Sequence, residues 1–338
     1  MIRVSVVGAA GYSGAEAVRL LARHPRVELA GLFGSPGGKG AAFSSLHPDL
    51  AGAPGPDVVP YSEEALLEAR PDAAILATPN EVSAELAPRL LAAGIRVVDV
   101  SGAFRLKDPA LYPSWYGFAH PAPGLLAEAV YGLTEWCGEE LAGVRLVANP
   151  GCYPTSVLLA LKPLASLLDP SQPVVVASAS GVSGAGKKSE LAYSFCEVAG
   201  SYKAYAVGAH RHEPEMRQEL GLAPDAAFAF VPHLLPLVRG ILSTIHVSFA
   251  RPVVDAGVAG RYATAYDGRP LVRVHPAGRL PELRDVVGTP RAHVGWKLLD
   301  GGRRAVVVSV IDNLLKGAAS QAVQNLNRVF GMPETEGL

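Results

Sequence analysis

Short apolar runs alternate with helix-like stretches along the first half of the chain. Residues 2–7, 27–33, 73–77 and 95–100 are rich in Val, Ile, Leu and Ala and have the length of buried strands. Helical spacing of apolar residues follows the first and third runs, at 15–23 and 80–93. Because strand and helix recur as units of this length, the pattern predicts a right-handed, doubly wound parallel sheet.

The second half of the chain has a different pattern. Residues 241–250 alternate apolar and polar side chains, as in a long strand of a sheet that is open on one face. We expect further strands at 174–179, 228–231, 271–274, 292–299 and 304–311, and a final amphipathic helix at 312–330. The predicted fold class is therefore α/β, with a Rossmann-type doubly wound parallel sheet plus an α+β domain built on a mostly antiparallel sheet.

The composition of the chain mainly excludes classes of protein. A chain of 338 residues is long enough for two domains. Lys plus Arg (30) nearly balance Asp plus Glu (31), so we expect a small-molecule partner rather than nucleic acid or a membrane. The chain enters a strand at residue 2, so no secretory signal is expected. Its three cysteines show neither a disulfide framework nor zinc-ligand spacing, which predicts a cytoplasmic protein without a metal.

A glycine-rich turn follows the first strand and opens the first helix. Gly8, Gly11 and Gly14 have the spacing G-x-x-G-x-x-G, which permits close backbone approach to a pyrophosphate at the helix N-terminus. The alternative is a glycine turn that binds no ligand. An NAD site would place an acidic residue near the end of the next strand, but Ser35 and Lys39 occur there and favour NADP.

Cys152 is the strongest candidate nucleophile. It lies in the segment 149–155 (NPGCYPT), between an apolar strand and a helix that we expect at 156–168, capped by Thr155 and broken near Pro163. A tight turn below the positive end of a helix favours a thiolate over a thiol. The alternative is a buried cysteine that acts as a small apolar residue.

Three further segments carry polar groups suited to binding an anion or to acid–base catalysis. Arg105 follows a strand end and could clamp an anion, although it could also be a surface arginine. The loop 180–188 (SGVSGAGKK) resembles a phosphate-binding loop, but Lys188 replaces the magnesium-binding Ser or Thr, which excludes an NTPase and leaves a phosphate nest or a hairpin tip. His210 and His212 suit general acid–base catalysis better than zinc binding, because no further ligand has suitable spacing.

Together these motifs resemble the N-acetyl-gamma-glutamyl-phosphate reductases of arginine biosynthesis. The segments that carry the resemblance occur in family order across nearly the full chain: GAAGYSG (8–14), DVSGAFR (99–105), NPGCYPT (149–155), SGVSGAGK (180–187), HRHEPE (210–215), VPH (231–233) and DNLLKGAASQAVQNLN (312–327). The resemblance implies a nucleotide-binding domain at 1–149, closed by the helix 312–331. It also implies a substrate and dimerisation domain at 150–311, as in semialdehyde dehydrogenases.

The resemblance also implies an activity and a set of site residues. The activity is the NADPH-dependent reduction of N-acetyl-gamma-glutamyl phosphate to N-acetylglutamate 5-semialdehyde and phosphate, through a thioester on Cys152, in a homodimer or homotetramer. His210 is the first choice for acid–base catalysis and His212 the second. The expected substrate contacts are Arg105, Asn149, Ser183, Gly184 and Lys187. The expected NADP contacts are Gly8, Gly11, Tyr12, Ser13, Gly14, Ser35, Lys39, Thr78, Pro79, Ser101, Gly181 and Asn313.

Two positions depart from the family pattern. Pro36 stands where the family often has an arginine for the 2′-phosphate, and Asn80 stands where it tends to have histidine.

A sibling activity would be the same chemistry on carrier-bound aminoadipyl phosphate in lysine biosynthesis, with an amino-group carrier protein as partner. Alternatives of another class are a cysteine acyltransferase or hydrolase, and a nucleotide-sensing module without turnover.

Overall fold

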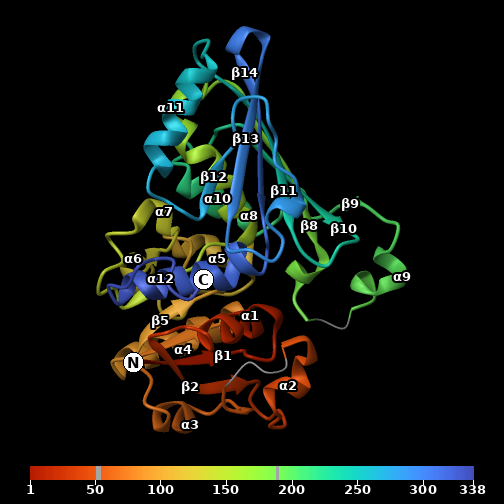
Figure 1. Cartoon of the computed structure of the whole chain (residues 1–338). Coiled ribbons are helices and arrows are strands. Elements are labelled where there is room, and N and C mark those ends of the chain that lie inside the picture. The colour runs from red at the N-terminus through yellow and green to blue at the C-terminus, as the bar shows by residue number, and fades with distance from the viewer. Residues whose placement is uncertain (51–54, 188–189) are drawn as a thin grey trace. The chain divides into compact units, whose positions relative to one another are not determined.

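The computed structural model describes residues 1–50, 55–187 and 190–338 (Figure 1). Lys188, on which the exclusion of an NTPase rested, lies outside these residues. The chain divides into two compact units. Unit 1 comprises residues 1–151 and 318–338, and unit 2 comprises residues 152–317.

Unit 1 is built on a seven-stranded sheet in which all neighbouring strands pair in parallel. The strand order is β3-β2-β1-β4-β5-β7-β6. The strands are β1 (Ile2–Val7), β2 (Val27–Gly34), β3 (Val58–Pro60), β4 (Ala73–Leu76), β5 (Arg96–Asp99), β6 (Val130–Tyr131) and β7 (Leu146–Ala148). β4 is completely buried, because helices cover both faces of such a sheet. This arrangement confirms the predicted doubly wound sheet.

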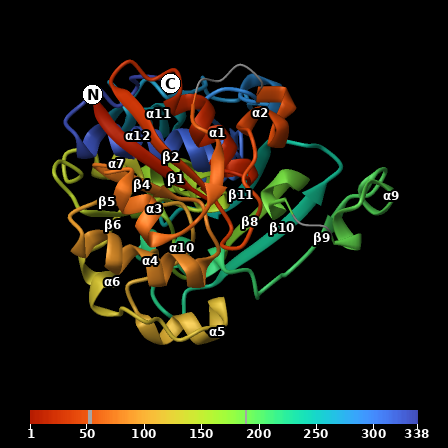
Figure 2. The ribbon, with the colours of Figure 1, turned by 90° about the horizontal axis from the view of Figure 1, so that it is seen from below.

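Helices pack on both faces of this sheet. Figure 2 shows α1 and α12 on one side of the strands and α3 and α4 on the other. Apolar side chains of α3 and α4 share one buried cluster with β1, β2, β4 and β5. The helices of unit 1 are α1 (Tyr12–Leu21), α2 (Phe43–Leu46), α3 (Glu63–Glu68), α4 (Asn80–Ala92), α5 (Tyr112–Tyr116), α6 (Gly124–Glu128), α7 (Thr134–Cys137) and α12 (Ser320–Val329).

The final helix differs from its prediction. One continuous helix was expected from residue 312, but a π-helical turn occupies Leu315–Ala319 and α12 begins at Ser320. The Asp312 carboxylate accepts hydrogen bonds from the amides of Leu314 and Leu315, and so caps this turn. α12 itself buries amide side chains, and Asn325 donates to the Gly132 carbonyl and to the Asn149 side chain. Polar packing of this kind is not visible in an apolar periodicity.

Unit 2 contains a mixed seven-stranded sheet with the order β12-β13-β14-β11-β8-β10-β9. The pairs β8–β10 and β12–β13 are parallel and the other four are antiparallel, as predicted for a mostly antiparallel sheet. The strands are β8 (Val174–Gly181), β9 (Lys203–Ala204), β10 (Phe228–Leu235), β11 (Ile241–Ser248), β12 (Val272–Val274), β13 (Ala292–Leu299) and β14 (Arg304–Ile311).

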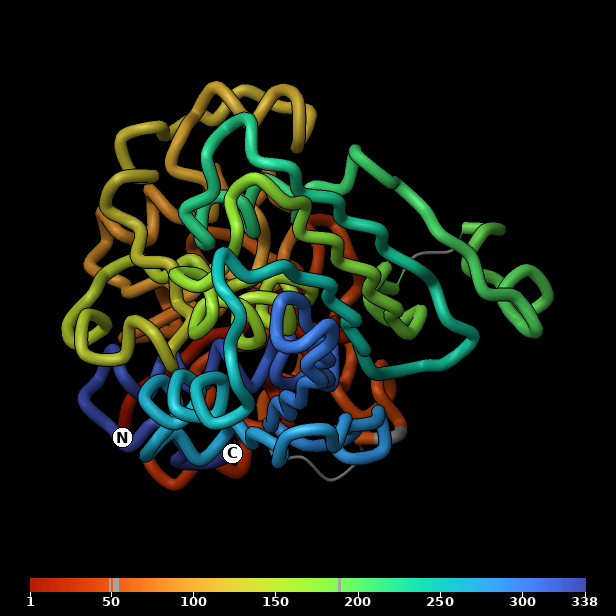
Figure 3. Tube along the Cα trace, turned by 90° about the horizontal axis from the view of Figure 1, so that it is seen from above, coloured from red at the N-terminus to blue at the C-terminus, as the bar shows by residue number. Residues whose placement is uncertain are grey.

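The helices of unit 2 are α8 (Cys152–Leu161), α9 (Phe195–Val198), α10 (His212–Glu219) and α11 (Asp255–Tyr266). α8 packs against β11 and β14 and is buried on all sides, as expected of a central helix. At its far end, the Tyr262 and Tyr266 hydroxyls donate to the carbonyls of Ala160 and Leu159 at 2.7 and 2.5 Å. The segment that carries α9 projects from the rest of unit 2 (Figures 1 and 3). Its Phe195 side chain is highly exposed.

Candidate active site

The glycine turn of unit 1 has no room for side chains at two of its three glycines. Gly8 has a φ of 91°, and a Cβ atom there would lie 2.2 Å from the Ala77 carbonyl oxygen. A Cβ atom at Gly14 would lie 2.2 Å from the Gly8 carbonyl oxygen. Gly11 is the N-cap of α1, whose first turn contains no acidic residue. The turn therefore presents main-chain amides and a positive helix end, which suit a pyrophosphate.

A buried polar network lies at the carboxyl ends of β4 and β5. The Thr78 and Ser83 hydroxyls lie 2.7 Å apart, and the Ser101 hydroxyl donates to Asp99 at 2.8 Å. Burial raises the pKa of the Asp99 carboxyl, while hydrogen bonds from Ser83 and Ser101 oppose that rise. Asn80 accepts the Gly102 amide at 2.8 Å. These bonds fix the loops where open α/β sheets bind ligands.

Other predicted cofactor residues flank this region of unit 1. Pro79 is the N-cap of α4, next to Thr78. Tyr12 and Ser13 open α1, and Ser35 and Lys39 are exposed beyond the end of β2. Asn80, at the position where histidine was expected from the resemblance, uses its side-chain oxygen to accept the main-chain amide of Gly102.

Arg105 is buried, so the alternative of a surface arginine is wrong. Its Nε donates to the Asn149 carbonyl and one terminal nitrogen donates to the Val100 carbonyl, both at 2.8 Å. The Asn149 side chain donates to the Ala318 carbonyl at 3.3 Å and accepts from Asn325 at 2.9 Å. Asn149 therefore positions the Arg105 guanidinium through its carbonyl, while its amide is held within unit 1.

Cys152 is the first residue of α8 in unit 2, so the expected start of this helix at residue 156 is wrong. Pro154 lies in the first turn, where its missing N–H costs no helical hydrogen bond. Thr155 is completely buried inside the helix and does not cap it. The predicted break near Pro163 is confirmed, because a 3-10 helix (Lys162–Leu167) follows α8.

The surroundings of Cys152 suit a reactive thiol. Cys152 is half-buried, so it is not fully enclosed in the core. A Cβ atom at Gly317 would lie 2.8 Å from the Cys152 Cβ, so only glycine fits there. Buried hydroxyls anchor α8 to the sheet, since Ser156 donates to Ser243 on β11 at 2.9 Å. A rigid helix N-terminus with a partly open cysteine favours the thiolate.

An aromatic cluster adjoins the cysteine. The Tyr153 hydroxyl lies 3.1 Å from the Tyr205 hydroxyl, which lies 3.5 Å from Nε2 of His210. Phe230 completes the cluster, with ring centroids 5.3 Å from Tyr153 and 5.4 Å from His210. Burial raises the pKa of the Tyr205 phenol to about 12, and the charge on Cys152 adds to the rise. Neither tyrosine was predicted from the sequence, although Tyr153 directly follows the cysteine.

The two candidate histidines differ in their environment. Nδ1 of His210 accepts the His212 amide at 3.1 Å, so the proton of its neutral ring is on Nε2, which faces Tyr205. Burial, and secondarily Arg211, lower the pKa of His210 to about 4. His212 is more deeply buried and packs edge-on against Tyr153. The structure thus brings His210 and the cysteine into one neighbourhood through Tyr153 and Tyr205.

The loop after β8 is anchored by Asn313. Its side-chain nitrogen donates to the Ser183 hydroxyl at 2.9 Å, and its oxygen accepts the Gly240 amide at 2.8 Å. Gly181 closely approaches the Val238 main chain, which leaves no room for a Cβ atom. Gly184 and Lys187 are exposed. Asn313 therefore joins two loops, with Lys187 accessible at the outer end of one of them.

In the part of the chain that the structure describes, no helix is long and apolar enough to cross a membrane. The candidate metal-ligating groups of this part do not include His210 or His212.

Comparison with known proteins agrees with this architecture. Residues 3–144 match the family described as semialdehyde dehydrogenase, NAD binding domain, and residues 152–313 match semialdehyde dehydrogenase, dimerisation domain. The chain shares its fold with aspartate semialdehyde dehydrogenase II from Vibrio cholerae, at a TM-score of 0.72 and 20% identity over 97% of this chain and 98% of that one. A probable aspartate-semialdehyde dehydrogenase from Pseudomonas aeruginosa gives a TM-score of 0.70 at 23% identity, over 96% of this chain and 97% of that one.

Sequence relatives are much closer. N-acetyl-gamma-glutamyl-phosphate reductase of Aeromonas salmonicida is 46% identical over 100% of both chains. The protein of the same name from Halorhodospira halophila is 46% identical over 100% of this chain and 98% of its own. Together with the cysteine at the tip of α8 and the glycine turn after β1, these relatives show that the chain belongs to the N-acetyl-gamma-glutamyl-phosphate reductase family.

Proposed function

We propose that the chain reduces N-acetyl-gamma-glutamyl phosphate to N-acetylglutamate 5-semialdehyde and phosphate with NADPH, in arginine biosynthesis, as a phosphorylating semialdehyde dehydrogenase. The single observation that carries this proposal is the half-buried Cys152 at the N-terminus of the anchored helix α8. A soft nucleophile at a positive helix end is what an acyl phosphate requires to become a thioester.

NADP is the cofactor, and its reduced form, NADPH, would supply the hydride when bound. The geometry of the glycine turn fits the pyrophosphate, since neither Gly8 nor Gly14 could carry a side chain. β2 ends at Gly34 without an acidic residue and is followed by exposed Ser35 and Lys39, which favours the 2′-phosphate of NADPH over the free hydroxyl of NADH. The proposed cofactor contacts are Gly8, Gly11, Tyr12, Ser13, Gly14, Ser35, Lys39, Thr78, Pro79, Ser101, Gly181 and Asn313.

Cys152 carries the covalent step. Its thiolate attacks the acyl carbon, the new C–S bond forms, and the bond from carbon to the phosphate oxygen breaks, so that phosphate leaves with that electron pair. Hydride addition to the thioester carbon places negative charge on the former carbonyl oxygen. Collapse of that oxyanion breaks the C–S bond, releases the aldehyde and restores the thiolate of Cys152.

His210 stabilises the oxyanion as a hydrogen-bond donor. Because Nδ1 accepts the His212 amide, Nε2 holds the proton and can point it at negative charge. The low pKa of His210 keeps the ring neutral near pH 7, so it donates a hydrogen bond rather than removing a proton from Cys152. Tyr205, within 3.5 Å of Nε2, completes this donor pair. His212 is the second choice and supports His210 through its amide.

The acyl phosphate and its carboxylate need cationic and amide partners. We assign these roles to Arg105, Ser183, Gly184 and Lys187, with Asn149 as the residue that positions Arg105 through its carbonyl. Arginine offers a planar fork for a carboxylate or phosphate, and the glycine loop offers amides.

The partners follow from the same assignment. The substrate is a small molecule, and the match to a dimerisation domain supports a homodimer or homotetramer. An amino-group carrier protein would be a partner only under the lysine-pathway alternative, which no relative reported above favours. A cytoplasmic location stays a prediction.

A paired assay tests the proposal. Acetylglutamyl phosphate and carrier-bound aminoadipyl phosphate are each offered with NADPH and with NADH. We expect turnover of acetylglutamyl phosphate with NADPH, and at least about tenfold lower kcat/KM with NADH. Preferential turnover of the carrier-bound substrate would instead assign the enzyme to lysine biosynthesis. Release of phosphate without oxidation of NADPH would instead indicate a hydrolase.

A further inference from the structure

Two histidines and an aspartate lie close together at one edge of the unit 2 sheet. The aromatic cluster beside Cys152 lies toward the opposite edge. His275 follows β12, Asp285 ends a 3-10 turn (Leu283–Asp285), and His293 lies on β13. The strand order places β12 and β13 at one end of the sheet and β8, β10 and β9 at the other. One nitrogen or oxygen atom from each of the three side chains lies within 4.8 Å of the others.

The spacing of these atoms is close to that of metal ligands. Nε2 of His275 lies 3.3 Å from Nδ1 of His293, and Oδ2 of Asp285 lies 3.9 Å from the same Nδ1. Zinc–nitrogen bonds of about 2.0–2.1 Å in a tetrahedron separate two nitrogens by roughly 3.3–3.4 Å. The histidine pair therefore already has the required separation. The carboxylate lies 3.9 Å from His293 and within 4.8 Å of the His275 ligand atom, so it needs to move inward by up to about 1.5 Å.

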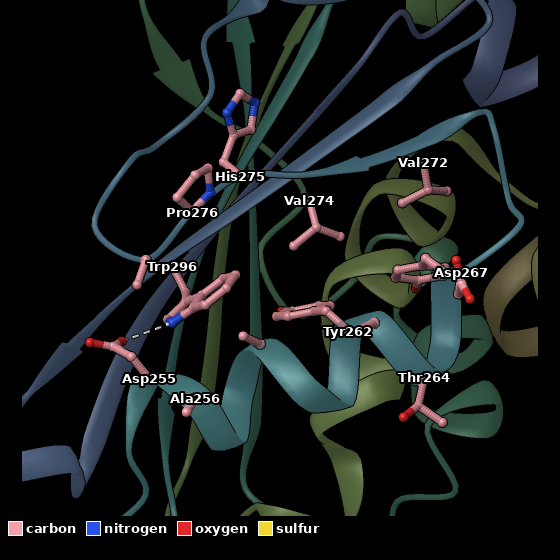
Figure 4. Close-up of a pocket in the computed structure, with 14 residues that line it drawn as sticks. Asp255, Ala256, Tyr262, Thr264, Asp267, Val272, Val274, His275, Pro276 and Trp296 are labelled. Atoms are coloured by element: carbon pink, nitrogen blue, oxygen red, sulfur yellow. Dashed lines mark hydrogen bonds between the residues drawn. The ribbon is translucent and has the colours of Figure 1, made fainter.

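The local fold holds all three side chains in place. His275 and His293 are 4% and 6% exposed. The His275 amide donates to the Val294 carbonyl at 2.8 Å, and Oδ2 of Asp285 accepts the Glu282 amide at 3.0 Å. Figure 4 shows the His275 ring pointing away from the stacked Tyr262 and Trp296 side chains that line the neighbouring pocket. Side chains positioned by their own backbone contacts need little rearrangement to bind an ion.

A purely structural histidine pair is the alternative explanation of these contacts. One N–H···N bond between the rings satisfies a single nitrogen of each, and Nδ1 of His275 is buried with no hydrogen-bond partner among the described residues. An ion would bind Nε2 of His275 rather than this nitrogen, so the unsatisfied Nδ1 does not distinguish the two explanations. The carboxylate of Asp285, which a hydrogen-bonded histidine pair does not need, favours the metal site. Asp285 is half-buried, so an ion and a water molecule can reach the cluster from its side.

We propose that His275, Asp285 and His293 bind a divalent transition-metal ion of the zinc class, with solvent in the remaining position. Two imidazoles and one carboxylate suit zinc, cobalt or iron, whereas calcium and magnesium prefer oxygen ligands alone. The ion would join β12, the 3-10 turn and β13, and so stabilise this sheet edge without entering the reaction. Arg273, Arg279 and Arg291 carry positive charge close to the pair, so we expect weaker binding than in a cysteine-ligated structural site.

Cobalt(II) titration of the full chain tests the site. The titration uses a Cys152→Ser background, so that the nucleophile cannot serve as a ligand. We expect one cobalt per chain, with visible d–d absorption and without a thiolate-to-cobalt charge-transfer band. His293→Gln and Asp285→Asn should each weaken binding by at least about tenfold. His246→Gln, which changes an exposed histidine on β11, is the matched control and should bind cobalt normally.

Three results would overturn the proposal: no cobalt binding, a thiolate charge-transfer band, or unchanged affinity in both ligand variants. Thermal unfolding without metal and NADPH binding show that each variant is folded. Asp285→Asn keeps an oxygen for the Glu282 amide and leaves the buried histidine pair intact, so it tests the site even if His293→Gln does not fold.

Discussion

The two ring nitrogens of His210 have different neighbours, and this difference limits the chemistry of the side chain. Nδ1 is occupied by the His212 amide, whereas Nε2 faces the Tyr205 hydroxyl. A neutral imidazole in this tautomer donates from Nε2 and cannot accept a proton there. The sequence motif HRHEPE indicates that a histidine is involved, but only the backbone geometry shows which nitrogen carries the proton.

The pH dependence of catalysis tests this assignment. With a pKa near 4, His210 does not change its charge between pH 5 and pH 8. His210→Asn should lower kcat by about 10²–10⁴-fold, because it removes a hydrogen-bond donor aimed at developing charge. The ratio of wild-type to variant kcat/KM, measured across pH 5–8, should be flat. A tenfold change in that ratio centred near pH 6.5 would show that His210 titrates as an ordinary catalytic histidine.

Helix termini organise both units. In unit 1, the turn before α1 is shaped by glycines that no other residue could replace at Gly8 and Gly14. In unit 2, α8 presents Cys152 at one end, and tyrosines from α11 satisfy its carbonyls at the other end. Each terminus is held by packing or hydrogen bonds rather than by its own helix propensity.

Two glycine variants separate folding from nucleotide binding. Gly8→Ala forces a Cβ atom against the Ala77 carbonyl at positive φ, so it should lower Tm by several degrees, in line with a strain of about 1–3 kcal/mol. A Cβ atom at Gly11 would lie 3.5 Å from the Gly8 carbonyl oxygen, an ordinary contact. Gly11→Ala should therefore keep Tm while weakening NADPH binding, as measured by calorimetry. Unchanged affinity for NADPH in folded Gly11→Ala would contradict the assignment of this turn.

The far end of α8 gives a separate prediction about stability. Tyr262→Phe leaves the buried Ala160 carbonyl without its hydroxyl donor. The free energy of unfolding should therefore decrease by about 1–3 kcal/mol. Differential scanning calorimetry measures the change. Tyr202→Phe, at an exposed ring, is the control and should have no effect beyond about 0.5 kcal/mol. Equal stability of the two variants would show that the hydroxyl bond to α8 contributes nothing.

Sequence patterns predicted the secondary-structure elements better than the residues at which these elements begin and end. The parallel and mixed sheets followed from apolar runs and alternation, because strand burial is a local property of side chains. The start of α8 at Cys152 was missed because Thr155 was expected to cap the helix, although Pro154 fits a first helical turn. The burial of Arg105, the pairing of Tyr205 with Tyr153, and the cluster of His275 with His293 depend on contacts between segments that are apart in the sequence. No local pattern encodes such contacts.

At the scale of the whole molecule, several histidines are buried as neutral rings. Burial lowers the pKa of His24, His120 and His210 below the usual 6.5. Below pH 6.5 the unfolded chain takes up protons that the folded chain does not. The stabilising contribution of these groups is therefore fully present above pH 6.5 and is lost as the pH falls toward their folded pKa values.

Thermal unfolding across pH tests this linkage. We expect a nearly constant Tm between pH 7 and pH 8 and a progressive decrease from pH 6.5 to pH 5. His120→Asn should flatten part of this decrease, since an uncharged amide takes up no proton in the unfolded state. A Tm that rises as the pH falls through this window would contradict the neutral, buried state of these histidines.

The whole account depends on a covalent intermediate at one sulfur atom, and mass spectrometry of the rapidly quenched enzyme tests it most directly. The enzyme is mixed with acetylglutamyl phosphate in the absence of NADPH. We predict a mass increase of one acyl group per chain, located at Cys152, in the wild type and in Cys196→Ser. Cys152→Ser should show no acylation and a kcat lower by at least about 10³-fold, with unchanged NADPH binding. Acylation at another residue, or full activity of Cys152→Ser, would contradict the account.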